Sequence, residues 1–255
     1  MMQGKTEEAN WFSRGGQNYS QYRPEYPQKL AEYLAKIAPD NQKALDVGCG
    51  TGQLTRLLSA YFTSVTGVDP SEDQLQNAFA APQITYVHSA AECLPAEFSR
   101  YNLITVAQAA HWFKLHDFYR EVQRVASSQA VIALISYGVL SIEGDVGERF
   151  KKFYYEEIDH LWPPERKLVD SGYRELYFPF EELSAPTFRI EVDWNMAALL
   201  GYISTWSAVR QAQQKEQEHI ITRFATELGV IWGNPDSCRK MFWPINMRIG
   251  KIQKA

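Results

Sequence analysis

Short apolar runs alternate with amphipathic stretches over the first half of the chain. Leu30, Leu34 and Ile37 recur at helical spacing, so the pattern predicts a helix over about 27–37. The runs that suit buried strands are 44–48, 64–68, 84–88, 101–107 and 130–135. Helical patterns lie between them, and strands that alternate with helices imply a parallel sheet covered on both faces. The predicted fold class is therefore α/β.

The pattern changes after about residue 138. Residues 147–161 and 196–229 read as helical, whereas 188–194 alternates as a strand does. No stretch has the composition of a flexible hinge, which favours a single domain over 1–255. Its expected parts are an N-terminal cap arm (1–26), a core (27–138), two lid insertions (139–186 and 196–229) and the final sheet strands (187–195 and 240–252).

Composition and charge narrow the class of partner. The formal charge is −4, which suits neither a nucleic-acid groove nor an anionic membrane surface. No run approaches the roughly 18 apolar residues that span a bilayer, and the three cysteines lack metal-ligand spacing. These observations predict a cytoplasmic protein without a bound metal. The basic residues Arg248, Lys251 and Lys254 are expected on a solvated strand edge.

A glycine-rich turn follows the first predicted strand. Residues 44–52 read Ala-Leu-Asp-Val-Gly-Cys-Gly-Thr-Gly. Gly48, Gly50 and Gly52 allow positive φ angles and a close approach of a ligand to the main chain. The helix that follows offers unpaired N–H groups to a carboxylate or a phosphate. The alternative is that the glycines make only a tight strand–helix connection.

Two acids and one missing glycine refine this nucleoside-binding pattern. A dinucleotide fingerprint places its third glycine where this chain has Gln53. Asp46, before the turn, could accept a hydrogen bond from an ammonium group on the ligand. Asp69 ends the next strand, where a carboxylate accepts both hydroxyls of a ribose. The alternative for Asp69 is a turn or helix N-cap aspartate before Pro70.

The run 45–52 resembles motif I of the class I S-adenosylmethionine-dependent methyltransferases, in the type 11 methyltransferase family. Segments 67–71, 89–95 and 101–104 are similar to that family in order and spacing. A narrower resemblance is to small-molecule enzymes like trans-aconitate methyltransferase. It is carried by Phe12-Ser13, Tyr19, Tyr22-Arg23-Pro24, Tyr26-Pro27, Ala110-His111-Trp112-Phe113 and Thr205-Trp206-Ser207-Ala208-Val209.

The resemblance implies a Rossmann-like seven-stranded sheet in the order 3-2-1-4-5-7-6, with the last strand antiparallel. It implies S-adenosylmethionine as cofactor and S-adenosylhomocysteine as product. The methionine part of the cofactor would lie on Asp46, Gly48, Cys49, Gly50 and Gly52. Its ribose would lie on Asp69 and its adenine by Ala91 and Glu92. Gln108 would lie beside the cofactor.

Polar and aromatic residues follow the fourth predicted strand, at the edge where open α/β sheets bind ligands. His111 could orient a substrate or take a proton, and is the candidate catalytic residue. Its alternative is a histidine that caps a helix or bonds the backbone. Trp112 could form the floor of a substrate pocket, although plain core packing explains it equally well.

An aromatic N-terminal arm forms a second constellation. Tyr19 and Arg23 could cap the cofactor, and Tyr22 could meet the substrate. Arg23 could also clamp a carboxylate with two parallel hydrogen bonds. In the lid, Trp206 is a candidate substrate contact. The alternatives are an arm fixed by aromatic burial, a surface arginine, and a lid that needs its own core.

The sequence thus predicts methyl transfer to a small organic acceptor, an oxygen nucleophile such as a carboxylate, by in-line displacement. Methylation of a phenol or amine, with His111 as base, stays open. So do a regulatory or scaffold protein that binds the cofactor without transferring methyl, and a nicotinamide-dependent oxidoreductase. The expected partner is a small-molecule substrate, with neither nucleic acid nor membrane, and the chain could be a monomer or a homodimer.

Overall fold

Five parallel strands form the centre of one sheet in the computed structural model, which describes residues 22–253. They are β1 (Lys43–Val47), β2 (Ser64–Asp69), β3 (Ile84–His88), β4 (Tyr101–Ala107) and β5 (Ala126–Tyr137). They pair in the order β3-β2-β1-β4-β5. The strand order reverses beside β1, where β1 pairs with both β2 and β4. The carboxyl ends of β1 and β4 therefore open onto the position where doubly wound sheets bind ligands.

A long antiparallel strand, β9 (Arg239–Lys251), extends the sheet beyond β5. One edge of β9 pairs with β5 and with the short β6 (Ser141–Ile142), and the other pairs with β7 (Glu181–Leu183) and β8 (Phe188–Trp194). The expected order 3-2-1-4-5-7-6 is confirmed, with β9 as the antiparallel strand and β7 and β8 together as the outer one.

Within residues 22–253 the sheet has nine strands rather than seven, because two lines of pairing are interrupted. Beside β9, β6 resumes the line of β5 after a short gap, and the outer edge breaks between β7 and β8. The outer gap contains Pro186, which has no N–H to donate to a ladder. β7 also shows that the outer edge begins inside 139–186, the segment expected to belong to the lid.

One expectation about the last strand is wrong. Arg248 and Lys251 do not lie on a strand edge, because β9 is paired along both sides. Arg248 instead donates hydrogen bonds to the carbonyl oxygens of Tyr173 and Leu176, at 3.2 and 2.6 Å. Lys254 lies outside the described residues. The C-terminal strand inserts into the sheet, a long-range event that a local charge pattern does not reveal.

Helices cover both faces of the parallel part of the sheet. One face carries α2 (Gln28–Ile37) and α3 (Gln53–Leu58), and the other carries α5 (Leu115–Val125) and α7 (Arg166–Asp170), while α4 (Glu72–Gln76) follows β2. Side chains alternate between the faces, so Leu103 packs with the first pair of helices and Ile104 with the second. The expected α/β architecture with helices on both faces is confirmed.

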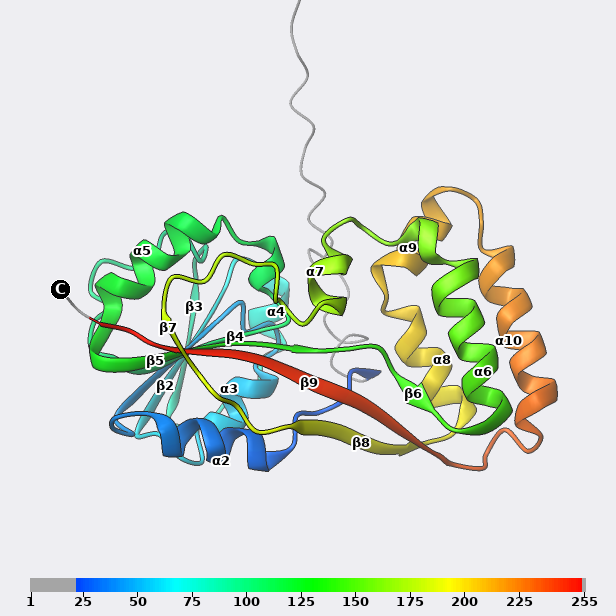
Figure 1. The fold of residues 1–255 in the computed structure, drawn as a ribbon, viewed down its shortest axis with the longest axis horizontal. Coiled ribbons are helices and arrows are strands. Elements are labelled where there is room, and N and C mark those ends of the chain that lie inside the picture. Colours follow the sequence, from blue (N-terminus) through cyan, green and yellow to red (C-terminus); the bar gives the residue numbers. More distant parts are fainter. Residues whose placement is uncertain (1–21, 254–255) are drawn as a thin grey trace, which may run out of the picture.

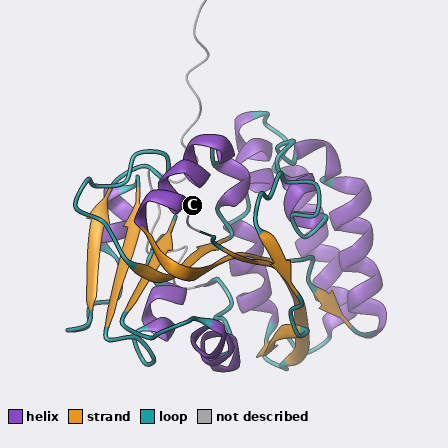
Figure 2. Cartoon of the chain, turned by 60° about the vertical axis from the view of Figure 1, so that its left-hand side comes forward, coloured by secondary structure: helices purple, strands orange, loops and turns teal. Residues whose placement is uncertain are grey.

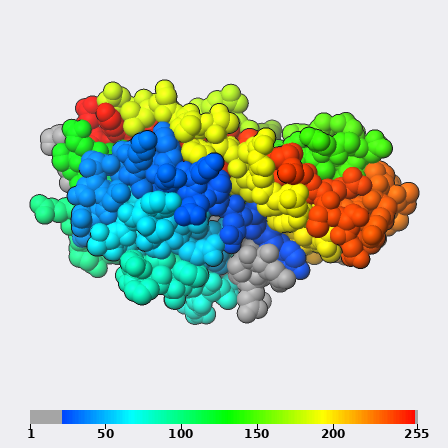
Figure 3. Space-filling model, turned by 90° about the horizontal axis from the view of Figure 1, so that it is seen from below, coloured from blue at the N-terminus to red at the C-terminus, as the bar shows by residue number. Residues whose placement is uncertain are grey.

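A further group of helices gathers beside the sheet as a helical lobe (Figures 1 and 2). This lobe comprises α6 (Gly144–Lys152), η2 (Phe153–Glu157), η3 (Asp159–Leu161), α8 (Met196–Ser204), α9 (Ser207–Gln214) and α10 (His219–Trp232). β9 reaches from the sheet to the base of the lobe, and β8 crosses the lower face between α2 and α10 (Figure 3). Trp206 lies at the centre of its core, 3% exposed, against the rings of Phe150, Phe153, Tyr154, Trp162 and Tyr202.

Candidate active site

The glycine turn is held against the end of β2 by its own backbone. Gly48 and Cys49 donate N–H bonds to the Val68 carbonyl, at 2.7 and 3.0 Å. Gly48, Gly50 and Gly52 have φ angles of 69°, 56° and 79°. A Cβ on Gly52 would lie 2.0 Å from the Tyr86 hydroxyl, so no other residue fits there without rearrangement. The packing, as well as the backbone angle, requires glycine in this turn.

Asp46 is a buried carboxylate at the base of the turn, 1% exposed. The Thr55 hydroxyl donates to its Oδ2 at 2.7 Å, and the Thr105 hydroxyl donates to its Oδ1 at 2.8 Å. Burial raises the pKa of Asp46 to about 6 although both hydroxyls oppose the shift, and the negative charge of Asp69 adds a smaller upward contribution. Because burial makes the ionised form of Asp46 unfavourable, a cation placed beside this carboxylate would stabilise it.

Asp69 joins the turn to the segment after β2. Its Oδ2 accepts from the Gly50 N–H at 2.8 Å, and its Oδ1 accepts from the Ser71 N–H at 2.9 Å. Burial raises the pKa of this carboxyl as well. Each carboxylate oxygen has a second lone pair, so Asp69 can still accept from two hydroxyl groups of a ligand.

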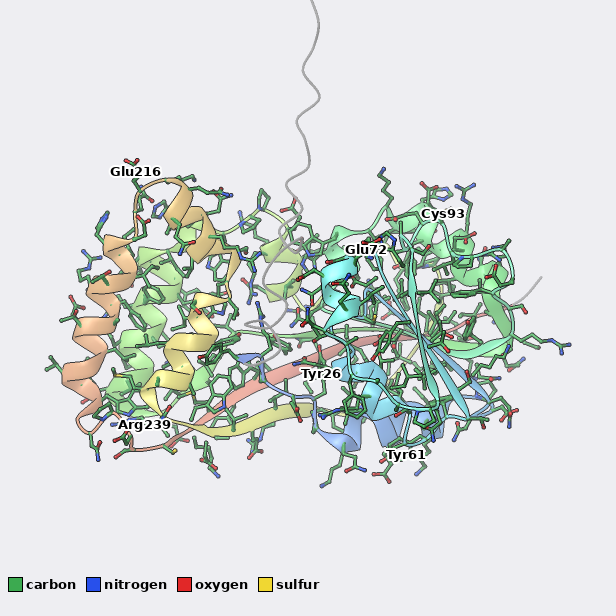
Figure 4. All side chains as sticks on the ribbon, turned by 180° about the vertical axis from the view of Figure 1, so that it is seen from behind. Tyr26, Tyr61, Glu72, Cys93, Glu216 and Arg239 are labelled. Carbon is green, nitrogen blue, oxygen red and sulfur yellow. The ribbon has the colours of Figure 1, made fainter. Side chains whose placement is uncertain are left out.

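A cavity of about 760 Å³, called here the large cavity, lies over the carboxyl ends of β1, β2 and β4. The sequence-predicted residues that line it are Asp46, Gly48, Cys49, Gly50, Asp69, Gln108, His111 and Trp112. Tyr26 also lines it, at the junction of the sheet and the helical lobe (Figure 4). In the same view Glu216 lies on the lobe and Cys93 on the side of the sheet. Burial raises the pKa of the Cys49 thiol, so Cys49 lines the cavity as a neutral group.

Other predicted site residues lie apart from this cavity. Gly52 caps α3 behind the turn, Ala91 is buried in the core, and the Glu92 carboxylate accepts from the Lys114 N–H at 2.7 Å. Tyr22 packs its ring on Gly201 of α8, where an added Cβ would lie 2.4 Å from the ring. Tyr19 lies outside the described residues.

A second, smaller pocket of about 60 Å³ adjoins the large cavity. The two share Gln108, His111, Trp112 and Pro163 in their linings. We call it the arginine pocket, because Arg23, Arg166 and Arg210 all line it, with Trp206 and Ser207 among their neighbours.

Two of these arginines are oriented by named contacts. Arg23 donates from Nη1 to the Tyr137 hydroxyl at 2.9 Å. Arg166, on α7, donates from Nε to Asp170 at 2.9 Å and faces the ring of Trp162. Sequence reasoning found Arg23 but missed Arg166 and Arg210. Arg210 directly follows segment 205–209, which carries part of the family resemblance and could have pointed to it. Nothing in the local sequence distinguishes Arg166 from a surface residue.

Gln108 and His111 form the boundary between the two spaces. Gln108 adopts a φ of 57°, unusual for a residue other than glycine, and donates from its side chain to the Tyr137 carbonyl at 3.2 Å. His111, in the short helix η1 (Ala110–Trp112), has its Nδ1 2.9 Å from the Tyr173 hydroxyl. Burial, and then the nearby charge of Arg166, lower the pKa of His111 to about 3. The imidazole is therefore neutral at pH 7.

Comparison with known proteins agrees with this geometry. A family model described as a methyltransferase domain matches residues 45–134. A Dictyostelium discoideum protein named "Putative methyltransferase" is 35% identical over 200 residues, covering 77% of this chain and 76% of that protein. A solved structure of "a Putative Type II Methyltransferase" from Anaeromyxobacter dehalogenans is 39% identical, with a TM-score of 0.85 over 92% of this chain and 100% of that one.

A more distant relative is a probable S-adenosylmethionine-dependent methyltransferase of Saccharomyces cerevisiae, 29% identical over 129 residues, which cover 47% of this chain and 44% of that protein. The fold and the cavity lining define a nucleoside-binding α/β enzyme. The chain belongs to the methyltransferases, and within them to the S-adenosylmethionine-dependent class I.

The residues present fit that cofactor on physical grounds. The turn leaves no room for a side chain at Gly48 or Gly52, one buried carboxylate suits an ammonium group, and a second suits a diol. Within residues 22–253 no cluster of three metal-ligating side chains occurs. No helix in that range is long and apolar enough to cross a bilayer.

Proposed function

We propose that the chain methylates a carboxylate of a small organic acid, with S-adenosylmethionine as donor. The observation that carries this proposal is the arginine pocket beside the large cavity. Guanidinium groups bind carboxylates through two parallel hydrogen bonds, and they match that anion better than they match an amine or a neutral ring.

The charges in the arginine pocket support an anionic acceptor. Burial lowers the pKa of Arg166 and the charge of Arg23 lowers it too, but Tyr154, Asp170 and Tyr202 outweigh them, so the net shift is upward and Arg166 stays protonated. Arg23 adds a second cation to the same pocket, and this positive charge is one that a bound anion can neutralise. Arg23, predicted as a cap on the cofactor, takes the role of an acceptor anchor in this proposal.

The state of His111 argues against a phenol or amine acceptor. A phenol has a pKa near 10, about seven units above the pKa of about 3 for His111. Moving a proton from such a phenol to this imidazole would be uphill by roughly 10 kcal/mol, at 1.36 kcal/mol per pKa unit. A carboxylate is already ionised at neutral pH and needs no base. His111 then orients the acceptor.

Bound S-adenosylmethionine would supply an electrophilic methyl group, and the carboxylate oxygen would take it by in-line displacement, with the S–CH₃ electron pair left on sulfur. The products are a methyl ester and S-adenosylhomocysteine. Asp46 would hold the ammonium group of the cofactor and Asp69 its ribose. The arginine pocket would fix the acid beside Gln108, and Trp112 would help to exclude water.

The test is a set of matched acceptors. Organic acids are compared with their amides, with phenols and with amines, and the release of S-adenosylhomocysteine is measured together with a base-labile methyl ester. We expect turnover with acids only. Methylation of amines or phenols, with acids left inert, would refute the proposal.

A variant pair tests the role of the pocket. Arg166→Gln removes one charged hydrogen-bond donor, so KM for the acid should rise about 10- to 100-fold, which corresponds to about 1.5–3 kcal/mol for a hydrogen bond to a charged group. Arg120→Gln is the control, because Arg120 lies on α5 and pairs with Asp117 on the surface. Equal KM values in both variants would count against an acid in this pocket.

A further inference from the structure

Tyr173 is a buried aromatic residue in a strained backbone conformation. It is 0% exposed and has a φ of 63°. The left-handed region costs a residue with a Cβ roughly 1–2 kcal/mol. Such strain persists only where the surroundings over-determine it, and it is concentrated at functional sites.

Hydrogen bonds and close packing hold this backbone in place. The Tyr173 N–H donates to the Leu168 carbonyl at 2.9 Å, and its carbonyl accepts from Arg248 of β9 at 3.2 Å. The preceding Gly172 also has a positive φ, and a Cβ there would lie 2.9 Å from the Asn246 side chain. The loop after α7 is therefore fixed against the last strand, and the Tyr173 ring is directed to one place.

The Tyr173 hydroxyl is directed at Nδ1 of His111. The Tyr173 hydroxyl lies 2.9 Å from Nδ1, and the two rings are 5.9 Å apart. His111 lines both the large cavity and the arginine pocket, so the ring nitrogen left for a ligand is Nε2. The bond made by one imidazole nitrogen decides which nitrogen carries the proton.

We propose that Tyr173 is a positioning residue: its hydroxyl donates a hydrogen bond to Nδ1 and so fixes His111 as the Nε2–H tautomer. A phenol hydroxyl is a stronger donor than a neutral imidazole N–H, and an imidazole nitrogen is a stronger acceptor than a phenol oxygen. The neutral state of His111 at pH 7 makes the choice of tautomer decisive. The tautomer is inferred from the contact alone, whereas its consequence for the acceptor rests on the proposed function.

In this tautomer the His111 nitrogen that faces the pocket is a hydrogen-bond donor, not the base expected for a phenol or amine acceptor. Nε2–H joins the guanidinium groups of the arginine pocket in offering only hydrogen-bond donors to the acceptor. An oxyanion can accept from all of them, whereas an ammonium group or a phenol hydroxyl would set donor against donor. Tyr173 thus contributes to acceptor specificity without touching the acceptor.

The test is the tautomer itself, read by long-range ¹H–¹⁵N spectra of the full-length chain labelled in its five histidines at pH 7. His111→Gln identifies the His111 signals by their loss. We expect an unprotonated Nδ1 and a protonated Nε2 in the wild type. A protonated Nδ1 would overturn the proposal without any variant of Tyr173 having to fold.

Tyr173→Phe is the second measurement. The two His111 nitrogens should move toward averaged shifts, and KM for the acid should rise about three- to tenfold, as expected for losing a hydrogen bond worth about 1 kcal/mol. The affinity for S-adenosylhomocysteine should stay unchanged. Tyr119→Phe is the matched control, because Tyr119 is also buried in the same core and donates to the Tyr177 carbonyl at 2.9 Å, away from His111.

The outcomes separate the two proposals. Unchanged nitrogen shifts or an unchanged KM in Tyr173→Phe would overturn the positioning role. If the tautomer is as stated but no acid is methylated, the proposed acceptor fails and the Tyr173–His111 arrangement stands.

Discussion

The raised pKa of Asp46 links cofactor binding to pH. Its carboxyl has a pKa of about 6 in the fold, against 3.8 for the ordinary group. The folded chain therefore holds this proton more tightly than the unfolded chain. The resulting stabilisation is complete below about pH 4 and is lost as pH rises through about 6. Two pKa units correspond to roughly 3 kcal/mol of unfolding free energy in the ligand-free chain.

Thr105→Val tests the hydrogen bonds that moderate this shift. Thr105 is fully buried, and valine replaces its hydroxyl by a methyl group of similar size. A hydrogen bond to a charged group is worth about 1.5–3 kcal/mol, so its loss should raise the pKa of Asp46 by about one to two units, to about 7–8. The ionised fraction at pH 7 then falls from about nine-tenths to between about one half and one tenth.

The ratio of variant to wild-type Kd for S-adenosylhomocysteine, measured by calorimetry, reports this change. In the proposed site an ionised Asp46 holds the ammonium group, so the ratio should be about 2–10 at pH 7. It should approach one above about pH 9 and grow toward about 10–100 at pH 5. The titration of the ligand's own amino group cancels in the ratio.

Thr66→Val is the control for this experiment. Thr66 is a buried threonine on β2 whose hydroxyl bonds Tyr101 at 3.1 Å and does not touch Asp46. Its ratio should not change with pH. A Thr105→Val ratio that is also independent of pH would refute the reasoning, because the affinity would then not depend on the charge of Asp46.

Three further predictions concern the turn and the lobe. Asp69→Ala should weaken S-adenosylhomocysteine binding at least about 100-fold by calorimetry, since two hydrogen bonds to a charged group are lost, while circular dichroism stays native; unchanged affinity would exclude the ribose role. Gly52→Ala should lower the unfolding free energy by about 2–4 kcal/mol, from backbone strain plus overlap with Tyr86. Gly144→Ala, at a φ of 71° with open space around it, should cost only the strain of about 1–2 kcal/mol; equal losses would contradict the packing argument. Trp206→Ala should cost about 3–5 kcal/mol in denaturant unfolding because it empties the core of the lobe; a loss below 1 kcal/mol would mean that the core is not packed around this ring.

The features that sequence predicted well are local in the chain. The run 44–52 fixes a strand, a turn and a helix start within nine residues, and Asp69 ends the neighbouring strand. Apolar periodicity gave the positions of the parallel strands, and the family resemblance gave their order. These features need only short-range geometry or a shared motif, so the sequence contains their signal.

The features that sequence missed arise from contacts across the fold. Arg166 of α7 and Arg210 of α9 line one pocket only in the folded chain, and Tyr173 reaches His111 because β9 holds its loop. No spacing in the chain records such meetings. Trp206 was expected to contact a substrate; the structure gives it a place in the pocket lining and also the centre of the lobe core.

The position of β9 has a consequence for how the chain is made. Every strand that pairs with β9 precedes it in the sequence, so all of them are synthesised before its residues 239–251. Until then the outer edge of β5 is without this partner, and its residues 130–137 are all buried in the finished protein. An open apolar edge invites pairing with another chain. The interval before β9 inserts is therefore when a nascent chain is most exposed to aggregation, and a chaperone that shields this edge would protect folding.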